Sequence, residues 1–572
     1  MATFILLVLS LLVASPSWAL PLDSHNSVPQ LKFPPVVPGN LFCSVDIPII
    51  SQWLCPRDSS SSSSASSSTS TSVSTPLGTA EGVSDISGVI RFPVRYGTAD
   101  RWQSSSVVTS WDLPSGASNA SGLPLACPQT DADASSYSED CLAMILYVPP
   151  SVQPGSDAPT LVWIHGGSFI SGSATAPGLD GSILATNTEA IVAVVQYRLG
   201  ALGFMVPDGE TNLGVKDMIT ALQFLQGVLP SFGGDASKIT LDGQSSGGSM
   251  IRALLAAPSA SDLFQSAILQ SDPMDYGMLN TTMQSTLQTF YNEQISCAST
   301  DTSCLDSLTL DTVLNAQVAL LNNSNSLCPA AGIAEPIRPV RDGVLITSPL
   351  DSTAPFPQQT KPILLSTVLD EAMLTIYGEF PQPISNDLYE EVVNVTFGEP
   401  RAGRLLAQSE YVVPAATNGD VTEDARPELQ TMGTDQVWRC ATWTFARNWV
   451  TAGGSAYVGL YVVGASYPGN SDVPECVQSG SVCHQDDIEI VFGTVPSPTS
   501  EQSALINEMQ ARYSAFMRTG NPNTGSYPNW TAATGDVIDA LQLGGSGNYA
   551  VGTCSPDYWG DYVEYDYQVY DI

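Results

Sequence analysis

From about residue 77 onward, short apolar runs alternate with amphipathic stretches, a pattern typical of an α/β protein. The apolar runs predict strands over residues 161–164, 190–196, 238–241, 267–269, 362–367 and 457–463. Apolar positions at helical spacing predict helices over residues 215–229, 250–255, 435–450 and 501–519. We therefore expect an α/β fold with a large, mostly parallel central sheet flanked by helices.

The first 76 residues differ in composition from the rest. An apolar run over residues 4–14 precedes Ser17-Trp18-Ala19, which has the small-residue spacing of a signal-peptidase site, and this predicts a signal peptide over residues 1–19. A membrane anchor is disfavoured because a spanning helix needs about 20 apolar residues. Residues 20–58 form an N-terminal extension, and the Ser/Thr-rich residues 59–76, which have no apolar face, are predicted to be a disordered linker.

The composition narrows the possible partners and compartments. The chain carries 56 acidic against 19 basic residues, a net charge of -37, which excludes a nucleic-acid binder that neutralises phosphates. No segment predicts stable membrane insertion. Secretion would be consistent with the 11 cysteines and with the Asn-x-Ser/Thr acceptors, which we expect in exposed loops. These predicted glycosylation sites are Asn119, Asn280, Asn322, Asn394 and Asn529.

The run Gly243-Gln244-Ser245-Ser246-Gly247 follows the predicted strand at 239–241 and opens a helix with an apolar stripe. Gly-x-Ser-x-Gly is a weak motif alone, but this strand–turn–helix context is the one that a nucleophile elbow requires. A sharp turn there would lift the serine oxygen above the sheet. Ser245 is therefore the candidate nucleophile.

A serine hydroxyl needs a base, usually histidine, and the chain has three. His25 lies in a polar, Pro-rich stretch near the N-terminus, and His165 directly follows a strand, in the place of an oxyanion loop. His484 is the remaining candidate. The third member should be a carboxylate after a late strand, where Asp370 and Glu371 follow residues 362–367. Spacing does not choose between these two.

Several blocks of the sequence, in order along the chain, resemble the type B carboxylesterase family, which includes fungal lipases, cholinesterases and neuroligin-like adhesion proteins. The blocks are Ser138-Glu139-Asp140-Cys141-Leu142, Gln196-Tyr197-Arg198-Leu199-Gly200, Asn212-Leu213-Gly214, Phe232-Gly233-Gly234-Asp235, the elbow, His484 with Asp487-Ile488 and Val491-Phe492-Gly493, and Asn521-Pro522-Asn523. The resemblance, to fungal-type secreted members above all, implies an α/β-hydrolase fold for residues 77–572 as a single catalytic domain with insertions.

The resemblance also implies roles for individual residues. The family's catalytic glutamate follows an aspartate in an Asp-Glu-Gly run, which selects Glu371, with Ala372 in place of the glycine. Gln244 stands where the family usually has a glutamate. This either argues against a choline-ester preference or reflects a hydrogen bond inside the elbow. The oxyanion hole would use the backbone N–H groups of Gly167, Ser168 and Ser246.

The cysteines yield three predicted pairs. The resemblance implies that Cys127 and Cys141 close the loop that is a lid in related lipases, and that Cys297 pairs with Cys304. Similarly, Cys476 and Cys483 would close a loop just before His484. The pairing of Cys43, Cys55, Cys328, Cys440 and Cys554 stays open, as does the oligomeric state. Because the lid loop is short, an esterase is favoured over an interfacially activated lipase.

Together these observations predict a secreted serine carboxylic ester hydrolase. Ser245, His484 and Glu371 would cleave neutral esters, of small molecules or lipids, through an acyl-enzyme intermediate. No metal or cofactor is expected. The alternatives are a triacylglycerol lipase of the same family and, from another class, a non-catalytic cholinesterase-like adhesion protein.

Overall fold

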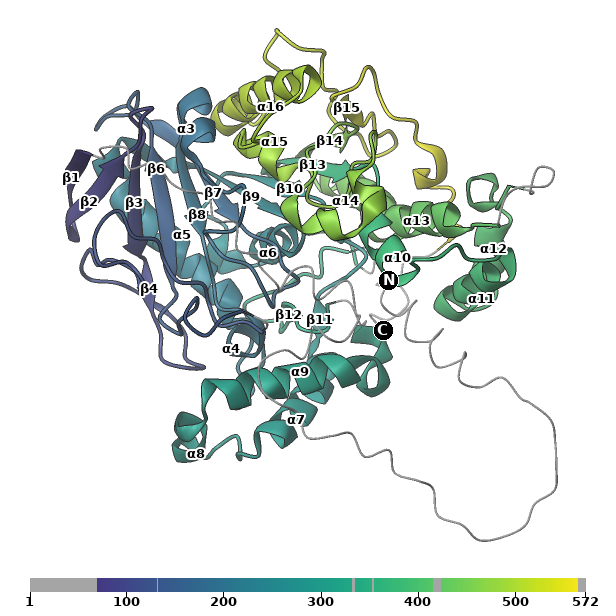
Figure 1. Ribbon diagram of the computed structural model, residues 1–572, viewed down its shortest axis with the longest axis horizontal. Helices are drawn as coiled ribbons and strands as arrows, with labels where there is room; N and C mark the ends of the chain where they lie inside the picture. Colours follow the sequence, from purple (N-terminus) through teal and green to yellow (C-terminus); the bar gives the residue numbers. More distant parts are fainter. Residues whose placement is uncertain (1–68, 131, 332–334, 352–353, 415–422, 564–572) are drawn as a thin grey trace.

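The computed structural model describes residues 69–563 apart from residues 131, 332–334, 352–353 and 415–422 (Figure 1). The predicted signal peptide, the N-terminal extension and residues 59–68 of the predicted linker lie outside the described residues. So do Cys43, Cys55 and His25. None of the described helices is long and apolar enough to cross a lipid bilayer.

The described chain is organised around an 11-stranded sheet in the order β1-β2-β3-β6-β8-β7-β9-β10-β13-β14-β15. From β8 to β15 all neighbours are parallel, whereas β1, β2, β3 and β6 add an antiparallel edge. The strands are β1 Thr69–Thr75, β2 Gly78–Ser84, β3 Ile90–Arg95, β6 Ala143–Val148, β7 Ala158–Ile164, β8 Ile191–Val195, β9 Gly234–Gln244, β10 Ser266–Gln270, β13 Pro362–Val368, β14 Ser455–Tyr461 and β15 Leu541–Leu543. The expected large, mostly parallel sheet is confirmed.

Strand β1 corrects the predicted linker boundary. Residues 69–75, placed in the disordered linker, form a strand that pairs antiparallel with β2 from Thr69 opposite Ser84 to Thr75 opposite Gly78. Threonine is β-branched and has a high strand propensity, and an edge strand needs only one paired side. A low content of apolar residues therefore did not prevent pairing, because the backbone supplies the hydrogen bonds.

Helices cover both faces of the sheet (Figure 1). Two adjacent residues of β7 point to opposite faces of the sheet. Val162 packs in the core cluster that holds α5 and α6, and Leu161 packs in the one that holds α3, α15 and α16. The helices are α3 Ser182–Thr188, α4 Gly200–Phe204, α5 Leu213–Phe232, α6 Ser246–Leu255, α7 Thr281–Ile295, α8 Thr302–Ser307, α9 Leu310–Leu327, α10 Met373–Glu379, α11 Asn386–Phe397, α12 Arg401–Leu406, α13 Arg426–Thr434, α14 Cys440–Thr451, α15 Ile488–Phe492 and α16 Ser500–Thr519.

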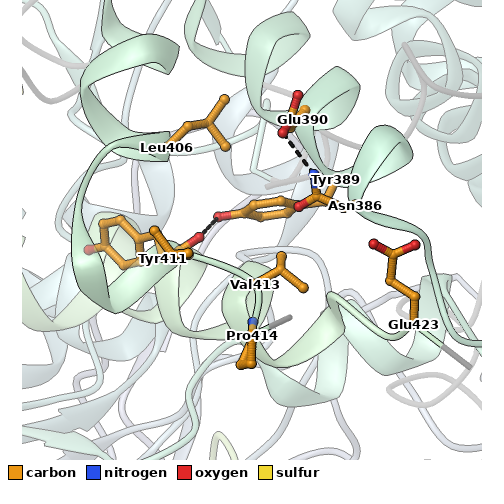
Figure 2. A pocket seen from close by; sticks show the side chains of 9 residues that line it. Asn386, Tyr389, Glu390, Leu406, Tyr411, Val413, Pro414 and Glu423 are labelled. Carbon is orange, nitrogen blue, oxygen red and sulfur yellow. Dashed lines mark hydrogen bonds between the residues drawn. The ribbon is translucent and has the colours of Figure 1, made fainter. Parts of the chain in front are cut away.

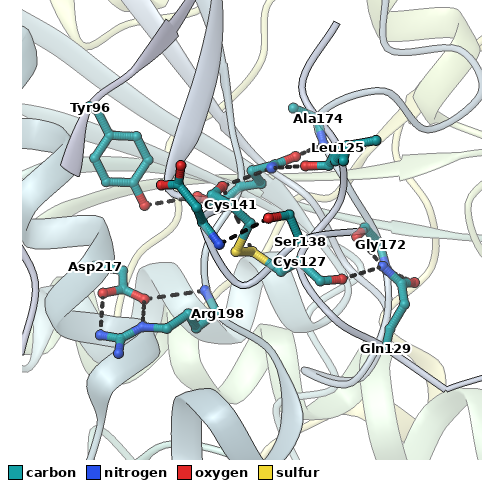
Figure 3. Close-up of a disulfide and its surroundings, with 12 residues drawn as sticks. Tyr96, Leu125, Cys127, Gln129, Ser138, Cys141, Gly172, Ala174, Arg198 and Asp217 are labelled. Carbon is teal, nitrogen blue, oxygen red and sulfur yellow. Dashed lines mark hydrogen bonds and ion pairs between the residues drawn. A yellow bond between two sulfur atoms is a disulfide. The ribbon is translucent and has the colours of Figure 1, made fainter. Parts of the chain in front are cut away.

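Disulfide bonds join Cys127 to Cys141, Cys297 to Cys304 and Cys476 to Cys483, which are the three predicted pairs. A fourth bond, which the sequence left open, joins Cys440 at the start of α14 to Cys554, 114 residues later. Cys328 is a free, half-buried thiol. The first bond holds a loop on the rest of the domain: Gln129 exchanges two hydrogen bonds of 3.1 Å with the backbone of Gly172 (Figure 3).

A buried ion pair holds α5 to the segment that follows β8. The Arg198 guanidinium donates to both carboxylate oxygens of Asp217 at 2.7 Å (Figure 3). It also donates to the carbonyl of Gln103 at 2.7 Å. Arg198 is 5% exposed and Asp217 is fully buried. Because every charge in this pair is matched by hydrogen bonds, the pair is tolerated in the core.

The predicted glycosylation asparagines do not all lie in exposed loops. Asn119 and Asn529 do, whereas Asn322 is exposed on helix α9. Asn280 caps α7 and Asn394 lies within α11, and both are half-buried. The expectation of exposed loops is therefore wrong for three positions, because a three-residue acceptor pattern says nothing about the element that carries it.

Candidate active site

Ser245 stands at the sharp turn between β9 and α6. Its backbone adopts φ 59° and ψ −129°, a left-handed conformation that costs a non-glycine residue free energy. Its N–H donates to the carbonyl of Gln270 at 2.9 Å, which fixes the turn on strand β10. Gly247 must be glycine, because a Cβ there would lie 2.1 Å from the carbonyl oxygen of Ile164. The turn leaves the serine 5% exposed.

The oxyanion loop, residues 165–169, lies directly above this turn. Gly167 has φ +114°, and a side chain there would clash with the carbonyl of Ser171 at 2.3 Å. Within the described chain, no residue accepts a hydrogen bond from the backbone N–H of Gly167 or Ser168. Ser246 is the first residue of α6, so its N–H has no partner inside its own helix. The three predicted donors thus retain free N–H groups.

His484 and Glu371 come together from segments 113 residues apart. The imidazole Nδ1 lies 2.6 Å from Glu371 Oε2, and Glu371 Oε1 accepts a hydrogen bond of 2.8 Å from the N–H of Val368. Glu371 is 1% exposed and His484 6%. The neighbouring carboxylate of Asp370 instead contacts Gln430, at 2.8 Å. The structure therefore brings Glu371, and not Asp370, to the histidine.

The loops that carry this acid and this base are fastened to each other. Asp370 N–H donates to the carbonyl of Val482 at 2.9 Å, and Asp370 Oδ2 accepts from the N–H of Val482 at 3.0 Å. The disulfide between Cys476 and Cys483 closes a seven-residue step that ends just before His484. The sheet thus positions Glu371, and the paired loops place the imidazole opposite it.

The second nitrogen of the imidazole faces the elbow. His484 Nε2 lies 3.2 Å from the amide nitrogen of Gln244, and no hydrogen bond joins it to Ser245 Oγ within the described part of the chain. An amide nitrogen is a donor only, so Nε2 accepts and Nδ1 carries the proton that faces Glu371. The ring of Trp438 lies 5.5 Å from the imidazole and closes one wall of the site.

Two buried carboxyl groups lie behind the histidine. Burial, and after it the charge of Glu371, raise the pKa of Asp487 to about 7, while the charge of His484 acts in the opposite direction. Neither oxygen of Asp487 has a hydrogen-bond partner among the described residues. Burial also raises the pKa of Asp242, which precedes the elbow on β9. Asp487 therefore titrates near neutral pH, and Asp242 keeps a proton over a range in which an exposed aspartate would release it.

His165 occupies the predicted oxyanion loop and does not face the nucleophile as a base. Its Nδ1 lies 2.8 Å from the carbonyl of Gly166, and its ring stacks on Tyr197 with 4.8 Å between centroids. Burial lowers its pKa to about 4, so the ring is neutral at physiological pH. It supports the loop from below.

Among the described residues, one group of side chains brings potential metal donors close together: Asp435, Cys440 and Cys554. The two cysteines are bonded to each other. The Asp435 carboxylate accepts hydrogen bonds from Tyr411 at 2.8 Å and from Thr553 at 2.6 Å. The sulfur atoms and the carboxylate are therefore already bonded to other groups, and the three residues do not fit a metal ion.

A separate cavity of about 340 Å³ lies between α11, α12 and the segment that follows them (Figure 2). Tyr389 crosses it and donates a hydrogen bond of 2.8 Å to the carbonyl of Tyr411. Its walls also include Leu406, Val413 and Glu390. It contains none of the catalytic candidates.

Sequence reasoning missed two residues at the site. Trp438 lies in a five-residue π-helical turn, Asp435–Arg439, inside what the apolar spacing predicts as one regular helix. Such π-helical turns are often found at functional sites, but no residue pattern predicts them. The second is Glu335, a buried acid near the oxyanion loop. Its only signal was a charged residue within an otherwise apolar stretch.

Comparison with known proteins finds a matching family and several similar relatives. The Carboxylesterase family matches residues 69–551. The chain is 29% identical over 400 residues to the Crystal protein of Dictyostelium discoideum, covering 68% of this chain and 70% of that protein. It is 27% identical over 411 residues to Carboxylesterase 1D of Rattus norvegicus (69% and 72% covered) and 26% identical over 413 residues to Cocaine esterase of Homo sapiens (69% and 70%).

Solved structures agree on the fold. A structure titled PNB esterase superposes with a TM-score of 0.68 at 24% sequence identity and covers 83% of this chain and 96% of its own. A thermophilic PNB esterase gives a TM-score of 0.66 at 23% identity. With a match that spans most of its described length, the chain belongs to the carboxylesterase family, has the α/β-hydrolase fold and is a carboxylic ester hydrolase.

Proposed function

We propose that the chain hydrolyses esters through Ser245, His484 and Glu371 by way of an acyl-enzyme. The observation that carries the proposal is the contact of 2.6 Å between His484 Nδ1 and Glu371 Oε2 beside the strained serine. With the proton on Nδ1, Nε2 is free to accept the serine proton, which is the tautomer that a general base requires.

In the first step, Ser245 Oγ bonds to the ester carbonyl carbon and its proton passes to His484. This step requires Nε2 to leave Gln244 and face the serine, a tightening that substrate binding commonly brings about. His484 then gives the proton to the leaving alcohol. Water enters the same site, His484 takes its proton, and the acid is released while Ser245 recovers its hydrogen.

The oxyanion formed in both steps would be stabilised by the N–H groups of Gly167, Ser168 and Ser246. The free state of these donors supports the assignment, because a preorganised donor needs no rearrangement when the charge develops. Removing one such donor typically lowers the rate by about 100-fold or more.

We further propose that the enzyme is an esterase acting on neutral soluble esters, rather than a lipase activated at an interface. Cys127 and Cys141 are 14 positions apart in the sequence, and the loop that they close is tied to Gly172 by Gln129. A short, tethered loop has little freedom to swing open on a lipid surface. An activity that rises sharply when a triglyceride passes its solubility limit would overturn this part.

The eight cysteines paired in the described chain also support the proposal that the protein is secreted, since disulfides persist in oxidising compartments. Expression of the full chain in a eukaryotic host tests this. Recovery of the protein from the medium, with a new N-terminus after residue 19, is the expected result, and retention in the cytosol would contradict it.

The nucleophile is tested by Ser245→Ala, with Ser237→Ala as the matched control. Ser237 is an exposed serine at the other end of the same strand, β9. We expect Ser245→Ala to lose nearly all hydrolysis of 4-nitrophenyl butanoate and all covalent labelling by an organophosphonate. The control should keep both. Labelling that persists in Ser245→Ala would disprove the role of this serine.

A further inference from the structure

The π-helical turn Asp435–Arg439 has no part in the mechanism above, yet it contacts residues 368–372, the acid loop that carries Glu371. The turn joins α13 to α14, and the N–H of Cys440 donates to the carbonyl of Asp435, five residues earlier. An α-helix would pair this N–H with a carbonyl four residues earlier, so the turn contains one additional residue. The additional residue changes which side chains of the helix face the acid loop.

Two side chains of this helical segment hold the backbone on either side of Glu371. Arg439 Nη2 donates to the carbonyl of Leu369 at 2.7 Å. Thr434 Oγ1 accepts a hydrogen bond of 3.1 Å from the N–H of Ala372, the residue directly after Glu371. Both side chains are buried, with Thr434 1% and Arg439 7% exposed. The acid loop is thus held at both flanks, and the Glu371 carboxylate between them faces the imidazole.

The π-helical turn brings both side chains to the same loop. In an α-helix of about 3.6 residues per turn, a residue five positions later lies about 140° farther round the axis, so Thr434 and Arg439 would face different sides. The π-helical turn closes over five residues instead, which returns Arg439 to the side of Thr434. Trp438, which a regular helix would place on that side, instead has its ring 5.5 Å from the imidazole.

The Arg439 guanidinium is itself fixed in direction. Its Nη1 donates to Asp435 Oδ1 at 3.1 Å, and Asp435 Oδ2 accepts from Tyr411 at 2.8 Å and from Thr553 at 2.6 Å. The ring of Tyr549 covers the guanidinium, with its centroid 5.1 Å away. A planar guanidinium held at two nitrogens keeps its donors in one geometry, which a flexible ammonium does not. The donor to the acid loop is therefore preorganised.

We propose that Thr434 and Arg439 are positioning residues for ester hydrolysis, which hold the acid loop so that the Glu371 carboxylate stays at hydrogen-bond distance from Nδ1 of His484. The inference rests on the proposed function, because it takes Glu371 and His484 as the acid and the base. Both residues act through Glu371, so their loss should slow the chemical steps and leave substrate binding unchanged. The pairing of the acid loop with Val482 remains in either variant, so the carboxylate should be displaced and not released.

The first test is Arg439→Met in the full chain, with Arg447→Met as the matched control. Arg447 is a buried guanidinium on α14 that donates to the carbonyl of Cys554 at 2.8 Å. We expect Arg439→Met to lower kcat for 4-nitrophenyl butanoate about 10- to 100-fold, because a misplacement of about 1 Å can cost about 100-fold. KM should keep its native value. Arg447→Met should lower the thermal midpoint but keep the native kcat per active site, with active sites counted by complete organophosphonate labelling.

The second test is Thr434→Val, which changes the shape of the side chain very little. It removes the oxygen that accepts from the N–H of Ala372 and should lower kcat about tenfold, less than the loss of a charged donor. Thr434→Ser keeps the hydroxyl and should restore most of the native kcat. The matched control is Thr442→Val on α14, a buried threonine whose hydroxyl has no partner among the described residues, and it should leave kcat unchanged. Arg439→Lys should recover part of the loss in Arg439→Met, because an ammonium still donates.

A spectroscopic readout separates positioning from a general loss of stability. The proton on His484 Nδ1 faces Glu371 Oε2 across 2.6 Å and should give a strongly deshielded proton NMR resonance, which Glu371→Gln should remove. In Arg439→Met and Thr434→Val this resonance should move upfield, because the hydrogen bond lengthens. It should keep its position in the two control variants, whose acid loop is unchanged.

The outcomes separate this inference from the proposed function. A native kcat in folded Arg439→Met or in Thr434→Val would overturn the inference, and so would an equal fall of kcat in the control variants. A rise in KM in place of a fall in kcat would also overturn it. If Arg439→Met does not fold, the comparison of Thr434→Val with Thr434→Ser and Thr442→Val decides. Full activity in Glu371→Gln would instead refute the proposed function.

Discussion

The contact between Glu371 and His484 allows a quantitative prediction for Glu371→Gln. The amide keeps the shape of the carboxylate and can still accept from Val368 through its oxygen. Its nitrogen would then face Nδ1 and act as a donor, so the imidazole would have to move its proton to Nε2. In that tautomer the ring has no lone pair to offer the serine.

The expected fall in kcat follows from the lost charge and from the changed tautomer together. A carboxylate and an imidazolium about 4 Å apart attract by about 4 kcal/mol at an effective dielectric constant of about 20. Loss of that attraction alone corresponds to about a 1000-fold fall in rate. In serine proteases the corresponding acid-to-amide change costs about 10,000-fold, because the tautomer is also wrong. We expect kcat for Glu371→Gln to fall between these two values.

The assay is the steady-state hydrolysis of 4-nitrophenyl butanoate, with the thermal midpoint measured in parallel. Asp370→Asn is the matched control, because Asp370 is adjacent in sequence but its carboxylate contacts Gln430 and Val482. It should lower stability more than it lowers kcat. A Glu371→Gln enzyme within tenfold of the native kcat would refute the reasoning, as would an Asp370→Asn enzyme with the larger catalytic defect.

Three further predictions follow from buried charges. Gln244→Glu should move the acidic limb of the pH profile of kcat/KM to higher pH by about one unit, because a carboxylate beside Nε2 favours the protonated imidazole. An acidic limb at the same pH as in the native enzyme would contradict this prediction. The folded chain holds a proton on Asp487 up to about pH 7 that an unfolded chain releases near pH 4, so stability falls as the pH rises across that range. Asp487→Asn should therefore raise the thermal midpoint more at pH 8 than at pH 5, and an equal change at both would count against a buried proton. Arg198→Met should destabilise the chain by about 3 to 5 kcal/mol in urea unfolding, because it leaves the Asp217 charge unpaired in the core; a loss under 1 kcal/mol would be too small for that account.

Local features of the fold could be predicted from the sequence, because their causes are local. The elbow is an example: a buried strand, two glycines and a helix with one apolar stripe occur within about 20 consecutive residues, and the structure has β9 and α6 there. The strands β7, β8, β10, β13 and β14 were found for the same reason. Helices α7 to α13 were not, because several of them are short and the polar faces of the others weaken the apolar period.

Contacts between distant segments could not be predicted in this way. Spacing alone left Asp370 and Glu371 equivalent, and only the pairing of their loop with Val482 turns one carboxylate toward the imidazole. The bond between Cys440 and Cys554 closes 114 residues and has no local signal. A family resemblance supplied Glu371, because it carries long-range information that periodicity lacks.

The neutral side chain of Gln244 helps to keep the imidazole of His484 unprotonated. Glu371 and Asp487 already lie close to His484, in a chain with 56 acidic residues. A third carboxylate at Nε2 would favour the charged imidazole, which cannot accept a proton from the serine. An amide donor holds Nε2 in its unprotonated form instead, and the raised pKa of Asp487 reduces the second negative charge near neutral pH. Both features keep the base available in an acidic protein.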